Sequence, residues 1–224
     1  MSDFQLPSQY LIEELLVAGT DVTGLFQNIE IFENIYSAGI TGSITILDSD
    51  AVAFIEGFKD RIDIFTEPIS FKFKNALDEV LVFDGFLSAL REEIVKQRVK
   101  LYVLDFISSA ILADTQTFVT KRFKDTPPQD IIGEMVDLIG LQSQIIGQGE
   151  PMNFVSGRRH PTQVMKWVCN NASDPESVVV EGEDQVGATA GPGGFLLWET
   201  LDGYRFCSIK QLLSVEEGDY PFIL

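Results

Sequence analysis

Hydrophobic and polar positions alternate most regularly between Leu25 and Asp48, in the sequence LFQNIEIFENIYSAGITGSITILD. In its second half, polar Thr41, Ser43 and Thr45 alternate with apolar or small residues, as on a strand with one buried face. A short connection at residues 37–39 separates the two halves. We therefore predict an antiparallel hairpin. Its apolar faces consist of Ile40, Gly42, Ile44 and Ile46 in the second strand and of Leu25, Ile29, Ile31 and Ile35 in the first.

Further apolar runs follow at short intervals, separated by polar connections. A series of short alternating strands is typical of an antiparallel barrel or a curved sheet. We therefore predict one β domain over residues 11–106, with a short helix that begins after Asp48. The run Leu11–Val17 fits either a strand or a helical turn. The strand-like runs are Arg61–Phe65, Ile69–Lys74, Val80–Arg91 and Lys96–Phe106.

The second half of the chain mixes helical and strand patterns. Apolar residues recur at helical spacing near 127–139, where Pro127 suits the first helical position and Gly140 suits the end. A second helix is expected near 162–171. A hairpin is expected over 195–209, because Asp202-Gly203 is a typical two-residue turn. We predict a small α+β domain over 107–213 and a C-terminal tail over 214–224. The fold class is therefore α+β, mainly β.

The residues that carry most enzyme chemistry are sparse in this chain. His160 is the one histidine, and the flanking Arg158 and Arg159 disfavour the proton that a general base must accept. Structural zinc needs about four Cys or His ligands, whereas Cys169 and Cys207 are the only cysteines and match no metal or redox spacing. We therefore predict no catalytic, metal or cofactor site, no enzyme activity and two buried free thiols.

Nothing in the apolar pattern indicates a membrane protein. No run approaches the length of about 18 apolar residues that a membrane-spanning helix needs. The N-terminal sequence MSDFQLPSQY has neither a basic region nor an apolar signal core. We therefore expect no membrane span and no cleaved export signal.

The sequence EIFENIYSAGITGSITILDSD resembles the opening hairpin of bacteriophage baseplate hub proteins of contractile tails, and that of the related hub module of type VI secretion spike proteins. The later order of TPPQDIIGEMVDLIG, PTQVMKWVCNNA and GFLLWETLDGYRFCSIKQL is similar to the same family. The resemblance implies an antiparallel tube-type β-barrel with an added small α/β domain. Larger members of the family continue into a second barrel, which this sequence does not show.

The resemblance also implies a function. It implies a structural virion protein, a baseplate hub subunit whose ring connects the tail tube to the central spike and lets DNA pass. The expected partners are copies of the same chain, as a trimer, together with a tail spike protein and tail tube proteins. The expected location is the tail baseplate of the virion, after synthesis in the host cytoplasm. Two alternatives stay open: a tail-associated cell-wall hydrolase that uses an Asp/Glu pair, and a secretion-system spike hub subunit.

The chain is strongly acidic, with sixteen Lys and Arg against thirty-four Asp and Glu and a formal net charge of −18. This charge predicts no specific nucleic-acid binding, because phosphate contacts depend on Lys and Arg. It favours either simple solubility or a bore that repels the DNA sliding through it. Such repulsion reaches only about 8 Å at physiological salt, so the acidic residues would have to line the bore itself.

One basic stripe stands out against this acidic background. Lys96, Arg98 and Lys100 alternate with uncharged residues in the predicted strand that begins at Lys96. The stripe fits a solvated outer face whose charges prevent edge pairing. It also fits a docking surface for an acidic neighbour in a ring of identical subunits. These three residues are therefore the candidate subunit-interface residues.

Overall fold

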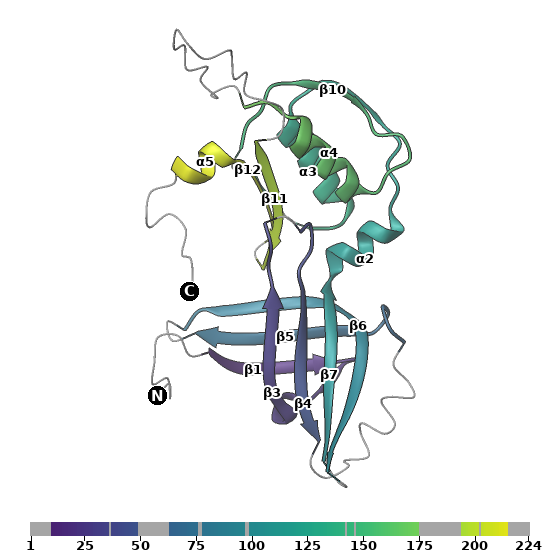
Figure 1. Cartoon of the computed structure of the whole chain (residues 1–224), viewed down its shortest axis with the longest axis vertical. Coiled ribbons are helices and arrows are strands. Elements are labelled where there is room, and N and C mark those ends of the chain that lie inside the picture. The colour runs from purple at the N-terminus through teal and green to yellow at the C-terminus, as the bar shows by residue number, and fades with distance from the viewer. Residues whose placement is uncertain are drawn as a thin grey trace. The chain divides into compact units, whose positions relative to one another are not determined.

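The structure is a computed structural model that describes residues 10–35, 37–48, 63–75, 78–96, 99–141, 143–145, 147–174, 194–201 and 203–214. The described chain forms two compact units (Figure 1). The half-barrel unit contains the described residues up to Phe32 and those of Gly39–Leu112. The helical unit contains Glu33–Ala38 and the described residues from Ala113 onward.

The half-barrel unit is a single curled sheet. Its strands follow the order β2-β1-β5-β6-β7-β4-β3, and every neighbouring pair is antiparallel. Strands β1 and β5 cross the direction of β3, β4 and β7, and the long β6 curves between the two groups (Figure 1). This confirms the predicted fold class, α+β and mainly β, with a curved antiparallel sheet. The strands are β1 (Tyr10–Val17), β2 (Thr20–Asp21), β3 (Phe26–Phe32), β4 (Thr41–Asp48), β5 (Pro68–Asn75), β6 (Val80–Lys96) and β7 (Val99–Ser108), with a 3-10 turn η1 (Thr23–Leu25).

The predicted first hairpin is present as the pair β3–β4. Its register runs from Phe26 opposite Ile46 to Phe32 opposite Thr41, and Ile40, Ile44 and Ile46 are buried as expected. The connection is longer than predicted, however, because β3 ends at Phe32.

The chain leaves the sheet after Phe32, and two of the residues that follow, Glu33 and Ala38, bond to distant parts of the chain. The hydroxyl of Tyr204 donates to the carbonyl of Ala38. The backbone N–H of Leu201 donates to the carboxylate of Glu33 at 3.2 Å. These partners lie more than a hundred and fifty positions away in the sequence. The alternation of apolar and polar residues in the sequence therefore extends beyond the last residue of β3, which is why the predicted strand was too long.

An aromatic cluster fills the concave side of the curled sheet. The ring of Phe71 lies 4.8 Å from that of Phe83 and 5.5 Å from that of Phe106, centroid to centroid. Phe83 and Phe106 are 4.9 Å apart. Gly42 faces this cluster closely, since a Cβ atom there would lie 2.3 Å from Cζ of Phe106. The buried glycine of the predicted hairpin therefore makes room for a core ring.

The helical unit combines short helices with two small sheets. The helices α3 and α4 pack on each other. The strands form a two-stranded ribbon β8–β10 and a three-stranded sheet in the order β11-β12-β9, where β9 is parallel to β12. Helix α2 (Ser109–Gln116) links the units along the chain, and its residues from Ala113 onward belong to the helical unit. The other elements are β8 (Arg122–Thr126), α3 (Pro128–Leu138), β9 (Ser143–Ile145), β10 (Met152–Val155), α4 (Pro161–Asn171), β11 (Phe195–Thr200), β12 (Gly203–Ser208) and α5 (Ile209–Ser214).

Several element boundaries differ from the sequence-based expectation. Helix α3 begins at Pro128 rather than Pro127, because a residue that precedes a proline avoids the helical conformation and Pro127 is extended. The strand-like run Phe118–Phe123, FVTKRF, forms a strand only from Arg122 onward. The run Arg61–Phe65 does not form a strand in its described part, where residues 64–66 form a turn. The short helix expected after Asp48 lies outside the described residues.

Candidate assembly surfaces

The one histidine of the chain lies in a group of hydrogen-bonded polar residues. His160 precedes α4, and its Nδ1 lies 2.8 Å from the carbonyl oxygen of Asp114 and 2.9 Å from that of Thr117. The carboxylate of Asp114 accepts hydrogen bonds from the backbone N–H and the hydroxyl of Thr162, both at 2.7 Å. These contacts tie the end of α2 to the start of α4. We call Asp114, His160 and Thr162 the polar node.

The two thiols are buried and free. Burial raises the pKa of Cys169 to about 12 and also raises the pKa of Cys207. Neither thiol is therefore activated as a nucleophile, since the thiolate is the reactive form. Within the described residues, no group of three or more His, Cys, Asp or Glu side chains is placed to hold a metal ion.

The described part of the chain contains no helix that is long and apolar enough to cross a membrane.

The curled sheet has two open edges. Strand β3 pairs with β4 on one side and with no described strand on the other. At the far end, β2 covers only Leu16 and Val17 of β1, which leaves residues 10–14 of β1 without a described strand on that side. Phe32, the last residue of β3, is 55% exposed. Unpaired backbone edges readily accept a strand from another chain.

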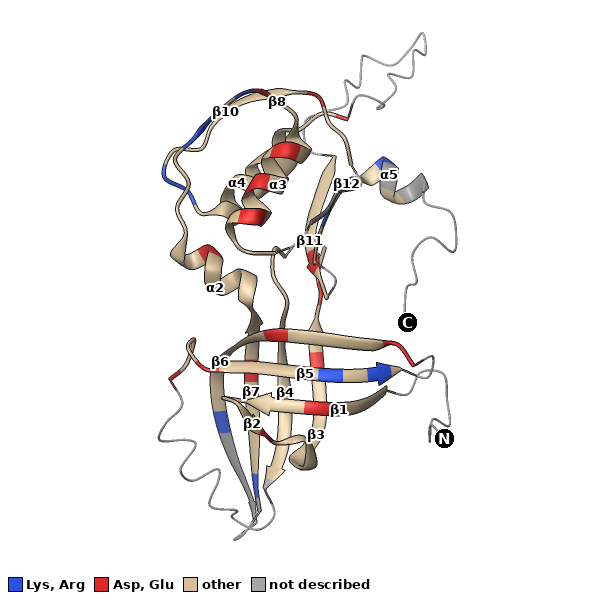
Figure 2. Ribbon diagram, turned by 180° about the vertical axis from the view of Figure 1, so that it is seen from behind, with Lys and Arg blue, Asp and Glu red and all other residues tan. Residues whose placement is uncertain are grey.

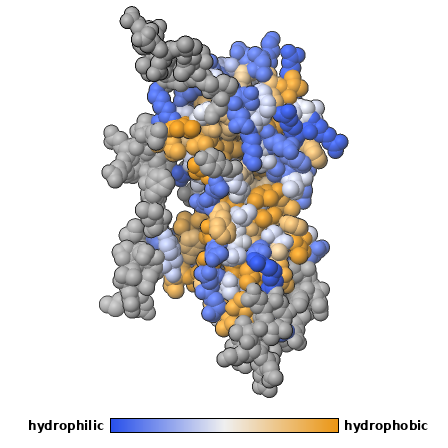
Figure 3. All heavy atoms as spheres, in the orientation of Figure 1, coloured by the Kyte–Doolittle hydropathy of each residue, from blue (hydrophilic) through white to orange (hydrophobic). Residues whose placement is uncertain are grey.

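The convex face over β1, β5 and β6 carries both ion pairs and apolar side chains. Nζ of Lys72 lies 2.5 Å from the carboxylate of Glu14, and that of Lys74 lies 2.8 Å from Asp78. The hydrogen bonds to these carboxylates raise the pKa of both lysines. Exposed apolar residues flank the pairs, and Figure 3 shows apolar residues reaching the surface of this unit. They are Leu11, Val80 and Val82.

The predicted basic stripe is not on one strand. Lys96 is the last residue of β6 and pairs with Val99, where β7 begins. Lys100 therefore lies on the next strand, opposite Ile94, and already takes part in a polar or electrostatic interaction. Arg98 lies outside the described residues. The prediction of a single alternating strand was wrong because the chain reverses between Lys96 and Val99. The interface role of the three residues stays a prediction.

A different basic surface lies on the helical unit, and the sequence analysis missed it. Positions occupied by Lys and Arg follow the ribbon β8–β10 and the segment after it, as the blue parts of the backbone show (Figure 2). A signal existed in the sequence, because residues 115–124 and 151–173 contain six of the sixteen Lys and Arg and no Asp or Glu. The two segments are far apart along the chain, and only the pairing of β8 with β10 brings them together.

Comparison with known proteins gives a result at the level of structure only. The sequence matches no protein-family model. It also matches no curated protein at a significant level.

The fold is similar to that of two solved tail proteins. The 43 kDa tail protein of prophage MuSo2 from Shewanella oneidensis matches with a TM-score of 0.53 and 11% identity, over 87% of this chain and 54% of that one. A tail protein from Neisseria meningitidis MC58 matches with a TM-score of 0.53 and 10% identity, over 89% of this chain and 50% of that one. The E. coli c3393 protein, a component of the type VI secretion system, has a TM-score of 0.45 and 10% identity over 89% and 49% of the two chains.

The two tail proteins establish the fold of this chain. The fold that the sequence resemblance implied is therefore confirmed. This chain spans about half the length of the tail proteins that it matches.

Proposed function

We propose that this protein is a structural subunit of a phage-type tail. In this proposal it is a baseplate hub subunit, and a ring of its copies connects the tail tube to the central spike and lets DNA pass. The observation that carries the proposal is the fold, which this chain shares over 87% of its length with a prophage tail protein. Residues 11–106 would form the tube-type barrel domain and residues 107–213 the small hub domain. The protein would act in the virion baseplate after synthesis in the host cytoplasm.

The open sheet edges support assembly into a ring. The two edges differ, since one belongs to β3 and the other to β1 and β2. Pairing of unlike edges is a head-to-tail contact, which closes into a ring when the rotation between subunits fits. In our proposal β3 of one copy pairs with β1 of the next, and three copies complete the ring. The tail spike protein and the tail tube proteins would bind its two ends.

The charge of the chain supports a passage for DNA rather than a DNA-binding site. A net charge of −18 opposes the phosphate contacts on which nucleic-acid affinity depends. We propose that the protein binds no specific nucleic acid and performs no catalysis. Lys96, Arg98 and Lys100 remain our candidates for contacts between subunits, now at the junction of β6 and β7. Reversal of all three charges is expected to weaken assembly.

The oligomeric state tests the ring. Light scattering across a concentration series should show a trimer. Phe32→Glu places a charge beside the open edge of β3 and should shift the equilibrium toward monomer. Leu138→Glu is the matched control, because Leu138 is similarly exposed but lies on α3 of the helical unit. A strict monomer, or equal effects of the two substitutions, would contradict assembly through the β3 edge.

The position in the particle tests the hub role separately. Electron microscopy of tails labelled with an antibody against this chain should place the label at the baseplate end. Label along the tube, or absence of the chain from purified tails, would contradict the hub role whatever the oligomeric state in solution.

A further inference from the structure

The ribbon β8–β10 is a local basic surface in an acidic protein. It combines Arg122 and Lys124 of β8 with Arg158 and Arg159 of the segment between β10 and α4. The stretches that contain these residues, 115–124 and 151–173, hold no Asp or Glu, and the one acidic residue of β8 is the exposed Asp125, directly after Lys124. The local charge is therefore opposite to that of the whole chain. We call Arg122, Lys124, Arg158 and Arg159 the basic ribbon.

The ribbon has a buried side and an exposed side. On the buried side, Phe123 and Phe154 stack with their centroids 6.1 Å apart, and Phe154 stacks on Trp167 of α4 at 3.9 Å. On the exposed side, Arg122 lies opposite Val155, and both are exposed. The aromatic stack anchors the ribbon on α4, and Arg122 and Val155 remain at the surface.

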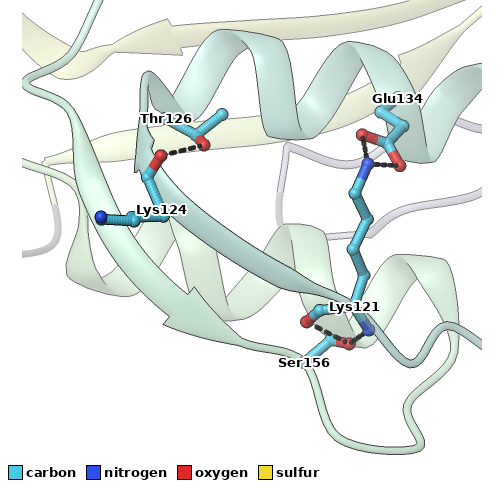
Figure 4. A network of polar contacts seen from close by, with 5 residues as sticks. All are labelled: Lys121, Lys124, Thr126, Glu134 and Ser156. Atoms are coloured by element: carbon cyan, nitrogen blue, oxygen red, sulfur yellow. Dashed lines mark hydrogen bonds and ion pairs between the residues drawn. The ribbon is translucent and has the colours of Figure 1, made fainter.

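Most of the positive charge on the exposed side is not neutralised within the described structure. Lys121 is paired, because its Nζ lies 2.6 Å from both carboxylate oxygens of Glu134 on α3. Figure 4 shows that Lys124 points away from this pair. Neither Lys124 nor Arg122 makes an ion pair with a described residue. Two charges of the basic ribbon are therefore available to a partner.

Exposed apolar side chains accompany these charges. Val155 is 63% exposed and Phe118 is 51% exposed. The guanidinium carbon of Arg158 lies 4.7 Å from the centroid of Phe118, so one face of that ring already orders an arginine. Exposed aromatic residues beside arginines are typical of protein interfaces.

The backbone of the ribbon is open to a further strand. The sheet has only two strands, so each of β8 and β10 has one edge that pairs with no other described strand. Charges at an edge deter indiscriminate pairing. Positive charges do not deter an acidic strand, because they attract its carboxylates. If the charges served only to protect the edge, the exposed apolar side chains of Val155 and Phe118 beside it would have no explanation.

We propose that the basic ribbon binds an extended acidic segment of a partner protein, which adds to the open edge of the ribbon. Backbone hydrogen bonds would hold the segment, as in other cases of strand addition, and its carboxylates would meet Arg122 and Lys124. A protein segment is favoured over nucleic acid, because a long polyanion would also meet the acidic remainder of this chain. The inference does not depend on the tail role.

A peptide titration tests the proposal. The probe is a peptide of about eight residues that alternates Glu and Val, long enough to form one strand. At moderate salt, the full chain labelled with 15N should show amide shifts in β8 and β10. Arg122→Gln with Lys124→Gln should weaken binding about tenfold, as expected for the loss of two exposed charge pairs. Lys72→Gln with Lys74→Gln is the control with the same charge change, and should leave binding unchanged.

Four other outcomes would overturn the proposal. Equal binding of a Gln-Val peptide would show that charge does not matter. Tighter binding of a short DNA duplex at the same amides would identify nucleic acid as the occupant. Shifts at β8 and β10 that depend only on protein concentration would assign the ribbon to a second copy of this chain. The absence of shifts at the ribbon with any probe would also refute the proposal.

Discussion

The two units of this protein are stabilised by different sets of contacts. The half-barrel unit depends on one sheet whose strands come from distant parts of the chain, and its core centres on Phe71, Phe83 and Phe106. The helical unit depends on two small sheets, two packed helices and the polar node. The first is bound by non-local apolar contacts and ends in open edges. The second has an apolar core of its own, to which the polar node adds specific hydrogen bonds.

The difference extends to the groups that titrate. In the half-barrel unit, the raised pKa values belong to Lys72 and Lys74, which are held by ion pairs at the surface. In the helical unit, burial raises the pKa of Cys169, Cys207 and Tyr204. Both tryptophans, Trp167 and Trp198, also lie in the helical unit. Tryptophan fluorescence therefore reports on that unit, and the comparison can be tested one unit at a time.

The largest expected effect comes from the core of the half-barrel unit. Phe106→Ala removes a buried ring that contacts both other rings of the cluster, and should lower the free energy of unfolding by about 3–5 kcal/mol. Urea unfolding followed by far-UV circular dichroism should show the loss. The tryptophan transition should change much less, because both tryptophans belong to the other unit.

Phe118→Ala is the matched control, since this ring is 51% exposed. It should cost far less than Phe106→Ala. An equal shift of both transitions in the Phe106→Ala variant would show that the two units unfold together, and would remove the energetic basis of the comparison.

The sequence predicted the parts of the fold that depend on local pattern. Alternation placed Ile40, Ile44 and Ile46 on a buried face, and helical spacing located α3 and α4 within a few residues. The prediction failed where contacts between residues far apart in the sequence determine the structure. The hairpin was expected to continue to residue 36, but Glu33 and Ala38 bond to residues of the helical unit near position 200. No local pattern carries that information.

The candidate surfaces were harder to predict than the fold. Lys96 and Lys100 appeared to share one face because the chain reversal between β6 and β7 has no strong turn signal. The basic ribbon was not predicted, because β10 has only four residues and its partner strand β8 lies some thirty positions earlier. A surface formed by two short segments depends on their pairing, which composition alone does not reveal.

A smaller effect is expected from the polar node of the helical unit. Asp114→Ala removes both hydrogen bonds to Thr162 at the start of α4, and should cost about 1–2 kcal/mol, as for the loss of a helix cap. The transition followed by tryptophan fluorescence should shift to lower urea, because Trp167 lies on α4. Asp114→Asn keeps one acceptor oxygen and should cost less. Equal losses in the two variants would show that charge, rather than hydrogen bonding, stabilises the node.

The smallest expected effect, over the interval from pH 8 to pH 10, is a pH dependence that belongs to the helical unit. Cys169 has a reference pKa of 9.0, and burial raises it to about 12. Above pH 9 the unfolded chain therefore loses a proton that the folded chain keeps. The stabilisation is complete below pH 9 and is lost as the pH rises toward 12, by about 1.4 kcal/mol for each pH unit. Cys207, also raised, acts in the same direction.

The measurement is urea unfolding followed by tryptophan fluorescence between pH 8 and pH 10, below the reference pKa of 10.5 for the lysines of the half-barrel unit. Cys169→Ala removes the titrating group, so its stability should fall less steeply over this interval than that of the natural chain. Both units contribute to far-UV circular dichroism, so the part of that transition that does not coincide with the tryptophan transition should show a weaker pH dependence, because the described residues of the half-barrel unit include no cysteine. An unchanged slope in Cys169→Ala would mean that this thiol does not control the alkaline limit. The helical unit would then not differ from the half-barrel unit through the titration of this buried thiol.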